Sequence, residues 1–312
     1  MKKIINLILL IAGFIFADFD DQLRSIYIQK DIKSEFVSTD FVLSCGRGKK
    51  SLVNRRWLHD PLIKKVIKNF ENFCKGEIQL IEDGESYIPK ILHFVWIGPP
   101  MPSRVKVAIE SWRYFHPDYE IKVWDNESLS DLEWIDDNFR NGFLEATSYS
   151  EKSDYIRMQA LYNYGGVYVD SDFICLKSFD SILNRKISFF AGIEVPNKLE
   201  NLNLVLNGAL IASIPGSEII RNCFSKFKKP SEAPGLGPNV RTGPYVVSQV
   251  LENYMKINQS DDVLILPCTY FYPTGTEWNL EKLSKKSTDF KKFINSISKE
   301  AMAVHLWAHS WK

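Results

Sequence analysis

The run from Ser153 to Asp172, SDYIRMQALYNYGGVYVDSD, constrains the fold more than any other part of the chain. Ser148 and Glu151 have the spacing of a capping box, which predicts a helix that begins near Ser148. The helix should end at Gly165-Gly166, because glycine readily adopts the left-handed conformation of a helix C-terminal cap. An apolar strand is expected from Val167 to Asp172. This order of helix, break and strand indicates one unit of an α/β fold.

The same alternation continues along most of the chain. The almost continuously apolar run at residues 91–97 is typical of a strand buried on both faces of a parallel sheet. Ser103 can cap the helix that follows this strand. Further strands are expected at residues 119–124, 187–193, 204–212, 263–266 and 303–306. Helices are expected at residues 103–114, 126–143, 217–227, 244–254 and 289–298, with a Pro/Gly-rich loop at 229–242. The pattern predicts an α/β fold whose mostly parallel central sheet is flanked by helices.

The N-terminal quarter of the chain differs from this pattern. Two lysines precede the apolar residues 4–17, and acidic residues follow, which is the layout of a secretory signal peptide at residues 1–17. An uncleaved signal-anchor is the alternative, although the run is shorter than the roughly 20 residues of a spanning helix. We therefore expect an exported or membrane-associated protein. Residues 18–87 carry one amphipathic stretch, at 55–74, so we expect an N-terminal helical extension before a main domain at 88–312.

Composition limits the classes of partner. Hydrophobic residues make up 45% and charged residues 25% of the chain, so it can bury a globular core. The formal net charge of +1 gives no electrostatic reason to bind nucleic acid, and no nucleic-acid partner is expected. The five cysteines form no CxxC or zinc-binding pattern. We interpret them as buried thiols, with one disulfide as the alternative in an exported protein.

Asp170 and Asp172 carry the clearest chemical signal. Two residues apart on a strand, they should face the same side as Tyr168, at the strand end where open α/β sheets bind ligands. Carboxylates are suitable ligands for Mn²⁺ or Mg²⁺, and such a cation can neutralise the diphosphate of a nucleotide sugar. Asp-x-Asp alone is a weak signal, but the preceding Gly-Gly-Val-Tyr-Val makes it much more specific. We therefore predict a metal site for a sugar-nucleotide pyrophosphate.

Two other places in the sequence are candidates for the same site. Asp154 and Arg157 are spaced i and i+3 on the preceding helix. They form either an ordinary surface ion pair or a carboxylate and a guanidinium that bind the donor sugar. Trp96 follows the first strand and is placed to stack on a nucleobase, whereas His93 is interpreted as a core histidine.

The C-terminal sequence VHLWAHSW contains two of the five histidines. A strand that carries His305 would bring an imidazole to the metal, and His309 is the alternative ligand. Ser310 offers a hydroxyl and Trp311 an aromatic ring or indole N–H for the diphosphate.

Together these residues resemble the DXD-containing glycosyltransferases of family 32, which include Och1-like mannosyltransferases and capsular polysaccharide sugar transferases. The chain also resembles the catalytic domain of the large clostridial glucosylating toxins. The resemblance covers about residues 88–311 and rests on the strings HFVWIG and SD..R...L...GG.Y.D.D, the TGP at residues 242–244 and the terminal His and Ser-Trp. It implies a GT-A fold, with a Rossmann-like sheet. It also implies a metal-dependent, retaining transfer of a hexose from a UDP- or GDP-sugar to a glycan, lipid or protein acceptor.

The resemblance also implies roles for single residues. These are base stacking for Trp96, donor-sugar binding for Asp154 and Arg157, contact with the nucleotide sugar for Tyr168, ribose and metal binding for Asp170, direct metal ligation for Asp172 and His305, a place beside the reaction centre for Asn207, and diphosphate binding for Ser310 and Trp311. The tail departs from that of the toxins, which have a glutamate near the tail serine.

Two other classes of protein share part of this pattern. A haloacid dehalogenase-like phosphatase also places Asp-x-Asp after an apolar strand, but it usually has Thr or Val where this chain has Ile174. A non-catalytic carbohydrate-binding protein would not need the two carboxylates, Arg157 and a terminal histidine together. No carboxylate stands out in the sequence as a nucleophile, so front-face attack by the acceptor is the expected route to retention.

Overall fold

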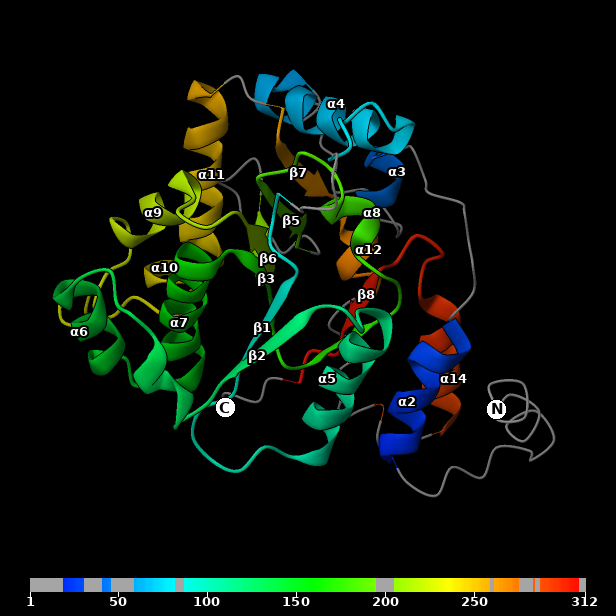
Figure 1. Cartoon of the computed structure of the whole chain (residues 1–312), viewed down its shortest axis with the longest axis horizontal. Helices are drawn as coiled ribbons and strands as arrows, with labels where there is room; N and C mark the ends of the chain where they lie inside the picture. Colours follow the sequence, from blue (N-terminus) through cyan, green and yellow to red (C-terminus); the bar gives the residue numbers. More distant parts are fainter. Residues whose placement is uncertain are drawn as a thin grey trace.

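A six-stranded sheet forms the centre of the protein (Figure 1). The computed structural model describes residues 19–30, 41–45, 59–81, 87–194, 205–258, 261–274, 283 and 287–308. The strands of the central sheet lie in the order β2-β1-β3-β6-β5-β7, and a second sheet pairs β4 with β8. The strands are β1 Ile91–Val95, β2 Glu120–Trp124, β3 Gly166–Val169, β4 Phe173–Cys175, β5 Phe189–Ile193, β6 Leu206–Ser213, β7 Val263–Leu266 and β8 Ala303–His305.

The central sheet is mixed but mostly parallel. β1 lies parallel to both β2 and β3, and β5 lies parallel to β7, whereas β6 runs antiparallel to β3 and β5. The predicted α/β fold is therefore confirmed, with β6 as its reversed strand. Because β1 and β3 are parallel neighbours, the residues that follow them meet at one edge of the sheet.

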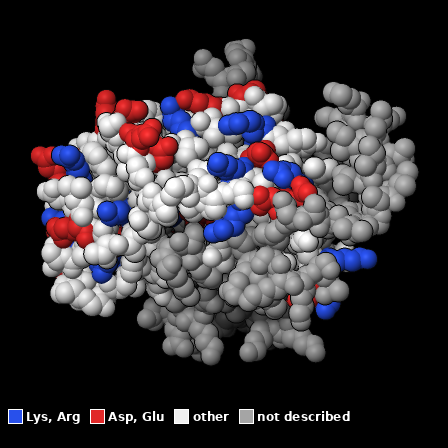
Figure 2. Space-filling view, turned by 90° about the horizontal axis from the view of Figure 1, so that it is seen from below, with Lys and Arg blue, Asp and Glu red and all other residues white. Residues whose placement is uncertain are grey.

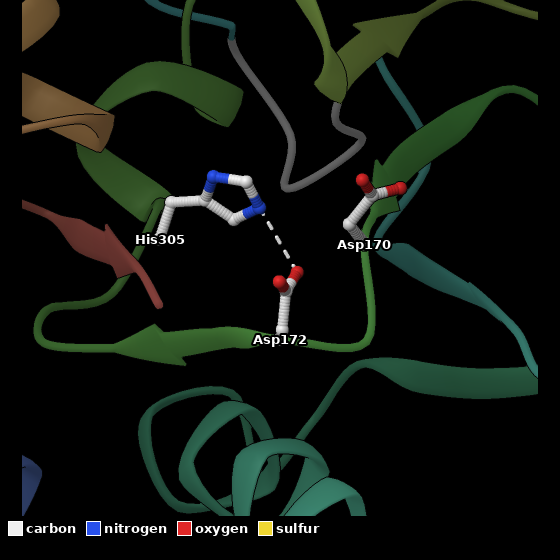
Figure 3. Close-up of side chains that lie close together, drawn as sticks. All are labelled: Asp170, Asp172 and His305. Atoms are coloured by element: carbon white, nitrogen blue, oxygen red, sulfur yellow. Dashed lines mark hydrogen bonds and ion pairs between the residues drawn. The ribbon is translucent and has the colours of Figure 1, made fainter. Parts of the chain in front are cut away.

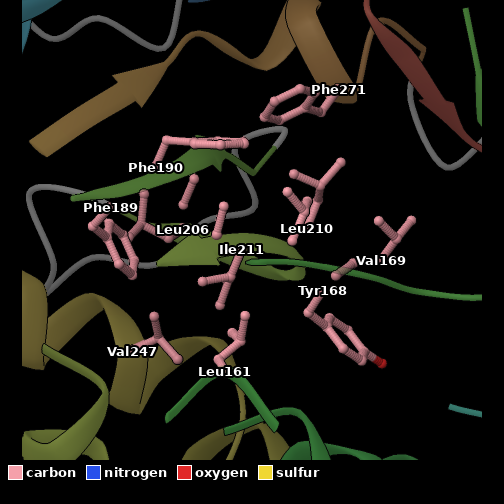
Figure 4. Packing of buried hydrophobic residues seen from close by; sticks show 14 of the residues in the cluster. Leu161, Tyr168, Val169, Phe189, Phe190, Leu206, Leu210, Ile211, Val247 and Phe271 are labelled. Atoms are coloured by element: carbon pink, nitrogen blue, oxygen red, sulfur yellow. The ribbon is translucent and has the colours of Figure 1, made fainter. Parts of the chain in front are cut away.

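Helices pack on this sheet from both sides. The helices are α2 Phe19–Lys30, α3 Phe41–Cys45, α4 Pro61–Lys75, α5 Ser103–Phe115, α6 Asp137–Glu145, α7 Tyr149–Tyr164, α8 Asp180–Leu183, α9 Glu218–Phe224, α10 Pro238–Arg241, α11 Pro244–Ile257, α12 Cys268–Phe271 and α14 Ser287–Ser296, with a 3-10 turn, η2, at Ser128–Asp131. Figure 4 shows Leu161 of α7 and Val247 of α11 on one side of β6, and Phe271 of α12 on the other. Every residue of β6 is buried, as expected for a strand covered on both faces. The sheet is thus a rigid platform for the loops at its edge.

The start of α7 and the break between α7 and β3 agree with the prediction, although β3 ends at Val169 and not at Asp172. The Ser148 hydroxyl accepts a hydrogen bond of 3.2 Å from the backbone N–H of Glu151 and so caps the helix. Gly165 follows the helix with a φ of 64°, and Gly166 has a φ of 94°. A Cβ on Gly166 would lie 2.5 Å from the carbonyl oxygen of Ile91. Gly166 therefore allows β3 to approach β1 closely, which sets the position of the residues after β3.

Two local predictions are wrong. Residues 126–143 do not form one helix, because the Asp125 carboxylate accepts backbone N–H groups and holds the turn at η2. A new helix, α6, begins only after Asp136, whose side chain caps it through the Phe139 N–H at 2.7 Å. Short acidic side chains compete with the helix in this way. Ser103 does not cap α5 either, since the cap residue is Pro102 and no side chain caps the helix there.

The amphipathic stretch near residue 60 forms α4, which starts later than predicted. Pro61 occupies the first turn, and the Asp60 side chain caps it through the Leu62 N–H at 2.8 Å. The helix packs on β7, and the Asn69 amide donates to the carbonyl oxygen of Val263 at 3.0 Å. The division of the chain at residue 87 stays a prediction, and the predicted signal peptide at 1–17 lies outside the described residues.

Three further features concern membrane-spanning helices, cysteines and surface charge. Within the described residues, no helix is long and apolar enough to cross a membrane. All five cysteines are free thiols, and all but Cys74 are buried. Figure 2 shows basic and acidic side chains interspersed on the described part of one face rather than gathered by sign.

His93 is the buried core histidine that the sequence suggested. One ring nitrogen contacts the carbonyl oxygen of Gly165 at 2.8 Å, and the other accepts from the Trp124 indole N–H at 3.2 Å. Burial lowers the pKa of His93 to about 4. His116 is also buried and bonded at both ring nitrogens, and burial lowers its pKa to about 4. Both imidazoles are therefore neutral in the native protein near pH 7.

These two histidines predict a loss of stability in acid. Above pH 6.5 both states of the chain carry neutral imidazoles; below it only the unfolded chain takes up protons, until the native pKa near 4 is reached. Each histidine should therefore lower the free energy of unfolding by about 3 kcal/mol as the pH falls from 7 to 4. Urea unfolding at pH 7 and pH 5 should show a smaller pH difference for His93→Gln than for wild type. The matched variant of the exposed His59, His59→Gln, should keep the wild-type difference, and an unchanged difference in His93→Gln would contradict this account.

Candidate active site

One cavity of about 430 Å³ opens at the sheet edge where β1 and β3 end. It brings together every predicted site residue that the structure describes: Trp96, Asp154, Arg157, Tyr168, Asp170, Asp172, Asn207 and His305. The other two predicted residues, Ser310 and Trp311, and the alternative ligand His309 lie outside the described residues. The predicted residues come from five separate stretches of sequence, so the fold rather than local sequence assembles the site.

The two aspartates lie in a turn and not on a strand, which corrects the prediction. β3 ends at Val169, and the Phe173 N–H returns to the carbonyl oxygen of Asp170 at 3.2 Å. The chain turns there because the next strand, β4, leaves the central sheet and pairs with β8. The Asp170 N–H still donates to the carbonyl oxygen of Ala209 at 2.7 Å, which fixes the start of the turn to β6. Both carboxylates therefore reach the cavity through the turn.

His305 approaches Asp172 from β8 (Figure 3). Its Nε2 lies 3.0 Å from Oδ1 of Asp172, and the Ala308 N–H donates to the other carboxylate oxygen at 2.8 Å. The imidazole stacks on the Phe173 ring at 4.7 Å between ring centroids. Its Nδ1 is buried and has no hydrogen-bond partner. Pairing of β4 with β8 thus brings the C-terminal histidine to the aspartates, as predicted.

This donor set fits a divalent cation. The ligand atoms of Asp170, Asp172 and His305 all lie within 4.8 Å of one another, and His305 and Asp172 are buried. Two carboxylates with one imidazole suit Mn²⁺, and carboxylates alone suit Mg²⁺. The nitrogen of His305 that faces the aspartates is Nε2, whereas Nδ1 points away from them (Figure 3). The three residues are therefore the ones that would hold the metal.

Arg157 is the centre of a buried polar network. Its Nη1 lies 3.0 Å from Asp154 and its Nη2 lies 3.1 Å from Asp170, so one guanidinium joins the helix to the turn. The guanidinium also lies over the Tyr168 ring at 4.3 Å, and the Tyr168 hydroxyl donates to Asp170 at 2.7 Å. The ion pair between Asp154 and Arg157 is buried and not a surface pair. Asp154 is further held by the Thr242 hydroxyl at 2.8 Å.

Burial and neighbouring charge set the ionisation of the carboxylates. Burial raises the pKa of Asp154 to about 6, against the opposing effect of the Arg157 guanidinium. Burial also raises the pKa of Asp170, which Arg157 opposes and Asp172 reinforces. Burial alone would raise the pKa of Asp172, but His305 and its hydrogen bond outweigh burial and hold that pKa below its usual range. Such divergent shifts within one cleft are typical of functional sites.

A glycine makes room for the guanidinium. A Cβ on Gly208 would overlap Nη1 of Arg157. The neighbouring Asn207 is buried, and its side-chain oxygen accepts the Ala209 N–H at 2.9 Å, which keeps this part of β6 in place. The absence of a side chain at Gly208 therefore leaves the space that the Arg157 guanidinium occupies.

Gly208→Ala is expected to displace Arg157 and lower activity by about 100-fold, since small displacements of positioning groups have effects of this size. Overpacking should also destabilise the protein by about 1–3 kcal/mol. The control is Gly237→Ala, because a Cβ there meets nothing within 4 Å. Steady-state kinetics and urea unfolding of both variants check this prediction. Equal activity of the Gly208→Ala variant and wild type would show that the guanidinium has no role in turnover.

A second buried ion pair was not found from the sequence. Arg241 of α10 donates from Nε and Nη2 to the two carboxylate oxygens of Glu151 on α7, each at 2.8 Å. Glu151 is completely buried. The adjacent Thr242 bonds to Asp154, so neighbouring residues fasten α10 to two positions one turn apart on α7. We call Glu151, Asp154, Arg241 and Thr242 the α7–α10 clamp. Their separation of about 90 residues in the chain left no local signal to find them by.

Glu194 and Trp307 are among the cavity residues that the sequence did not single out. Glu194 lines the cavity directly after the buried strand β5, and an acidic residue that ends a buried strand is a signal that could have found it. Trp307 has a φ of 48°, and its ring lies 4.3 Å from that of His305. Trp96, which was predicted, lines the cavity with its indole N–H bonded to the carbonyl oxygen of Pro99 at 2.8 Å.

Comparison with protein families decides the class of activity. Residues 102–188 match the model of the glycosyltransferase sugar-binding region that contains a DXD motif. The chain therefore carries a glycosyltransferase sugar-binding region of the DXD type. The matched range ends beyond Asp172 and includes the Asp154–Arg157 pair. The phosphatase and the non-catalytic binding protein are thereby set aside.

Several curated proteins are similar to the transferase. It is 27% identical over 229 residues to inositol phosphoceramide mannosyltransferase 2 of Schizosaccharomyces pombe. The aligned region covers 71% of this chain and 64% of that protein. It is 26% identical over 193 residues to an uncharacterized glycosyltransferase of Acanthamoeba polyphaga mimivirus. The aligned region covers 60% of this chain and 73% of that protein. Among solved structures it resembles PaToxG glycosyltransferase, with 20% identity, a TM-score of 0.44, and coverage of 62% of this chain and 80% of that one. The transferase thus spans less than two thirds of the mannosyltransferase.

Proposed function

We propose that the protein is a metal-dependent, retaining transferase that moves a hexose from a UDP- or GDP-sugar to an acceptor hydroxyl. The cluster of Asp170, Asp172 and His305 beside Arg157 in one cavity is the single observation that carries this proposal. Several relatives are named inositol phosphoceramide mannosyltransferases, which makes a mannosyl donor the first to test. The predicted signal segment supports a place outside the cytoplasm or at a membrane.

Each part of the cavity has a task in this proposal. Asp170, Asp172 and His305 would hold Mn²⁺ or Mg²⁺, which supplies charge neutralisation at the diphosphate when bound. Trp96 stacks on the base, and Asp154 and Arg157 orient the donor sugar. Ser310 and Trp311 are proposed to contact the diphosphate.

We propose front-face attack as the chemical step. The acceptor oxygen forms a bond to the anomeric carbon on the face from which the diphosphate leaves. The bond between that carbon and the diphosphate oxygen breaks, and its electron pair stays with the diphosphate. The leaving diphosphate oxygen takes the proton of the acceptor hydroxyl, so no protein base is needed. Arg157, fixed by two carboxylates, stabilises the charge that develops.

A donor-hydrolysis screen tests the proposed function. The full chain, stripped of metal with EDTA, is incubated with UDP-glucose, UDP-galactose, UDP-N-acetylglucosamine and GDP-mannose, with and without Mn²⁺. We expect release of UDP or GDP from at least one donor, and only after Mn²⁺ is added. Equal release in EDTA and in Mn²⁺ would contradict the metal requirement. Trapping of a glycosyl-enzyme adduct would contradict front-face attack.

A further inference from the structure

The Thr-Gly-Pro sequence at residues 242–244 begins behind the cavity wall. Pro238 and Pro244, at the two ends of the segment that carries Thr242, line the cavity. Thr242 itself is completely buried and is not among the lining residues. A ligand in the cavity therefore does not reach the Thr242 side chain. Any effect of Thr242 on the reaction must pass through a residue that does line the cavity.

The Thr242 hydroxyl contacts such a residue, Asp154. Its Oγ1 lies 2.8 Å from Oδ2 of Asp154 and 3.3 Å from the carbonyl oxygen of Pro238. A hydroxyl donates one proton, and the carboxylate is both the closer and the charged acceptor, so Asp154 receives the hydrogen bond. Asp154 lines the cavity, where the proposed function assigns it to the donor sugar. Thr242 thus holds a donor-sugar residue from behind.

The bond from Thr242 decides how Asp154 pairs with Arg157. Arginine and carboxylate side chains often pair through two parallel hydrogen bonds, as Arg241 and Glu151 do. Asp154 instead has Oδ1 at 3.0 Å from Nη1 of Arg157, while its Oδ2 bonds to Thr242. These two contacts, one at each oxygen, fix the plane of the Asp154 carboxylate. Without the hydroxyl, the carboxylate is free to turn about its Cβ–Cγ bond toward the guanidinium.

The backbone around Thr242 is itself held in place. The N–H groups of Thr242 and Gly243 donate to the carbonyl oxygen of Pro238, at 2.9 and 3.0 Å. A Cβ on Gly243 would lie 2.9 Å from the Cα of Asn239, so the turn leaves no room for a side chain there. The preceding residue, Arg241, is fastened to α7 by the α7–α10 clamp. The hydroxyl therefore holds Asp154 from a fixed position.

We propose that Thr242 is a positioning residue for the transfer reaction, and that its hydroxyl keeps the Asp154 carboxylate in the orientation that binds the donor sugar. This inference rests on the proposed function, since it assigns a further residue to the same reaction. The metal cluster does not depend on Thr242, because Asp170 is held separately by the Tyr168 hydroxyl at 2.7 Å. Loss of the Thr242 hydroxyl should therefore act on the donor sugar and not on the diphosphate.

The test compares changes at two buried threonines. Thr242→Val removes the hydroxyl and keeps the branched shape, whereas Thr242→Ser keeps the hydroxyl. Thr269→Val is the matched control, because Thr269 is buried away from the cavity and its hydroxyl has no hydrogen-bond partner within the described residues. Each full-length variant is supplied with Mn²⁺ and the nucleotide sugar that wild type hydrolyses. Two quantities are measured, kcat/KM for donor hydrolysis and inhibition by the nucleoside diphosphate product.

We expect Thr242→Val to lower kcat/KM for the donor by about 10- to 100-fold, the range for loss of one hydrogen bond to a charged group. Inhibition by UDP or GDP, which carry no sugar, should stay within about 2-fold of wild type, because the groups that bind them are not coupled to Thr242. A change that merely loosened the fold would weaken both. Thr242→Ser should recover most of the lost activity, and Thr269→Val should match wild type.

Three results would overturn the role of Thr242. These are wild-type kcat/KM in Thr242→Val, an equal loss in Thr242→Ser, and an equal weakening of donor turnover and of inhibition by the nucleoside diphosphate. Thermal unfolding shows whether each variant is folded at the assay temperature, and Thr242→Ala is measured against the same expectations if Thr242→Val is not. Absence of donor hydrolysis in wild type would instead contradict the proposed function.

Discussion

Asp172→Asn is expected to lower metal-dependent turnover by about 100- to 1,000-fold, the range found when one preorganised electrostatic group is removed. The variant keeps the shape of the side chain and one oxygen for the Ala308 N–H. It removes the negative charge that faces both His305 and the predicted cation. Mn²⁺ titration by calorimetry in the presence of UDP or GDP should show weaker binding, and steady-state rates should show the loss of activity.

The same change should cost little stability. His305 can lose its proton when its partner is neutral, so no unpaired charge stays buried. Repulsion between Asp170 and Asp172 is also relieved. Asp172→Ala is a poorer test, because it leaves the Ala308 N–H without an acceptor. The control is Asp118→Asn, an exposed carboxylate paired with Lys90, which should retain wild-type turnover. Wild-type activity of Asp172→Asn would overturn the assignment of the metal site.

Arg241→Met is expected to lower the free energy of unfolding by about 3–5 kcal/mol, because it leaves the Glu151 carboxylate buried and unpaired. The partly exposed pair of Lys229 and Glu232 serves as the control, and Lys229→Met should cost no more than about 1 kcal/mol. Urea unfolding of the two variants at pH 7 compares these values directly.

A double variant separates the charge from the packing. Arg241→Met combined with Glu151→Leu should recover most of the lost stability, since both charges leave the interior together. It should not recover activity fully, because the Glu151 carboxylate no longer sets the position of α10, which lines the cavity. A loss below about 1 kcal/mol in Arg241→Met would mean that Glu151 reaches water or another partner and that the clamp does not hold α10.

Local sequence predicted the elements of this fold better than it predicted their contacts. The cap at Ser148 and the glycines at 165 and 166 are local signals, and α7 and β3 form where they indicate. The turn that carries Asp170 and Asp172 was missed because its cause lies elsewhere, in the pairing of β4 with β8 more than 100 residues later. A strand pattern in sequence does not show which sheet the strand will join.

The candidate site shows the same division. Residue types that bind metal or stack on bases could be recognised one by one, and the fold brings those within the described residues into one cavity. The clamp could not be found, because Glu151 was assigned to a capping box with Ser148 and its side chain instead binds Arg241, about 90 residues away. Gly208 gave no local signal either, since its need for space comes from Arg157 on another element.

The most direct test of the central claim uses the nucleotide sugar that the wild-type protein hydrolyses in the screen. It measures Mn²⁺-dependent release of nucleoside diphosphate by wild type, Asp170→Asn and His305→Gln. We expect wild type to be inactive after EDTA and to recover with Mn²⁺, His305→Gln to need at least about 10-fold more Mn²⁺ for half-maximal release, and Asp170→Asn to recover little activity at any concentration. The same Mn²⁺ dependence in all three proteins would contradict the claim that this cluster holds the metal of a nucleotide-sugar site.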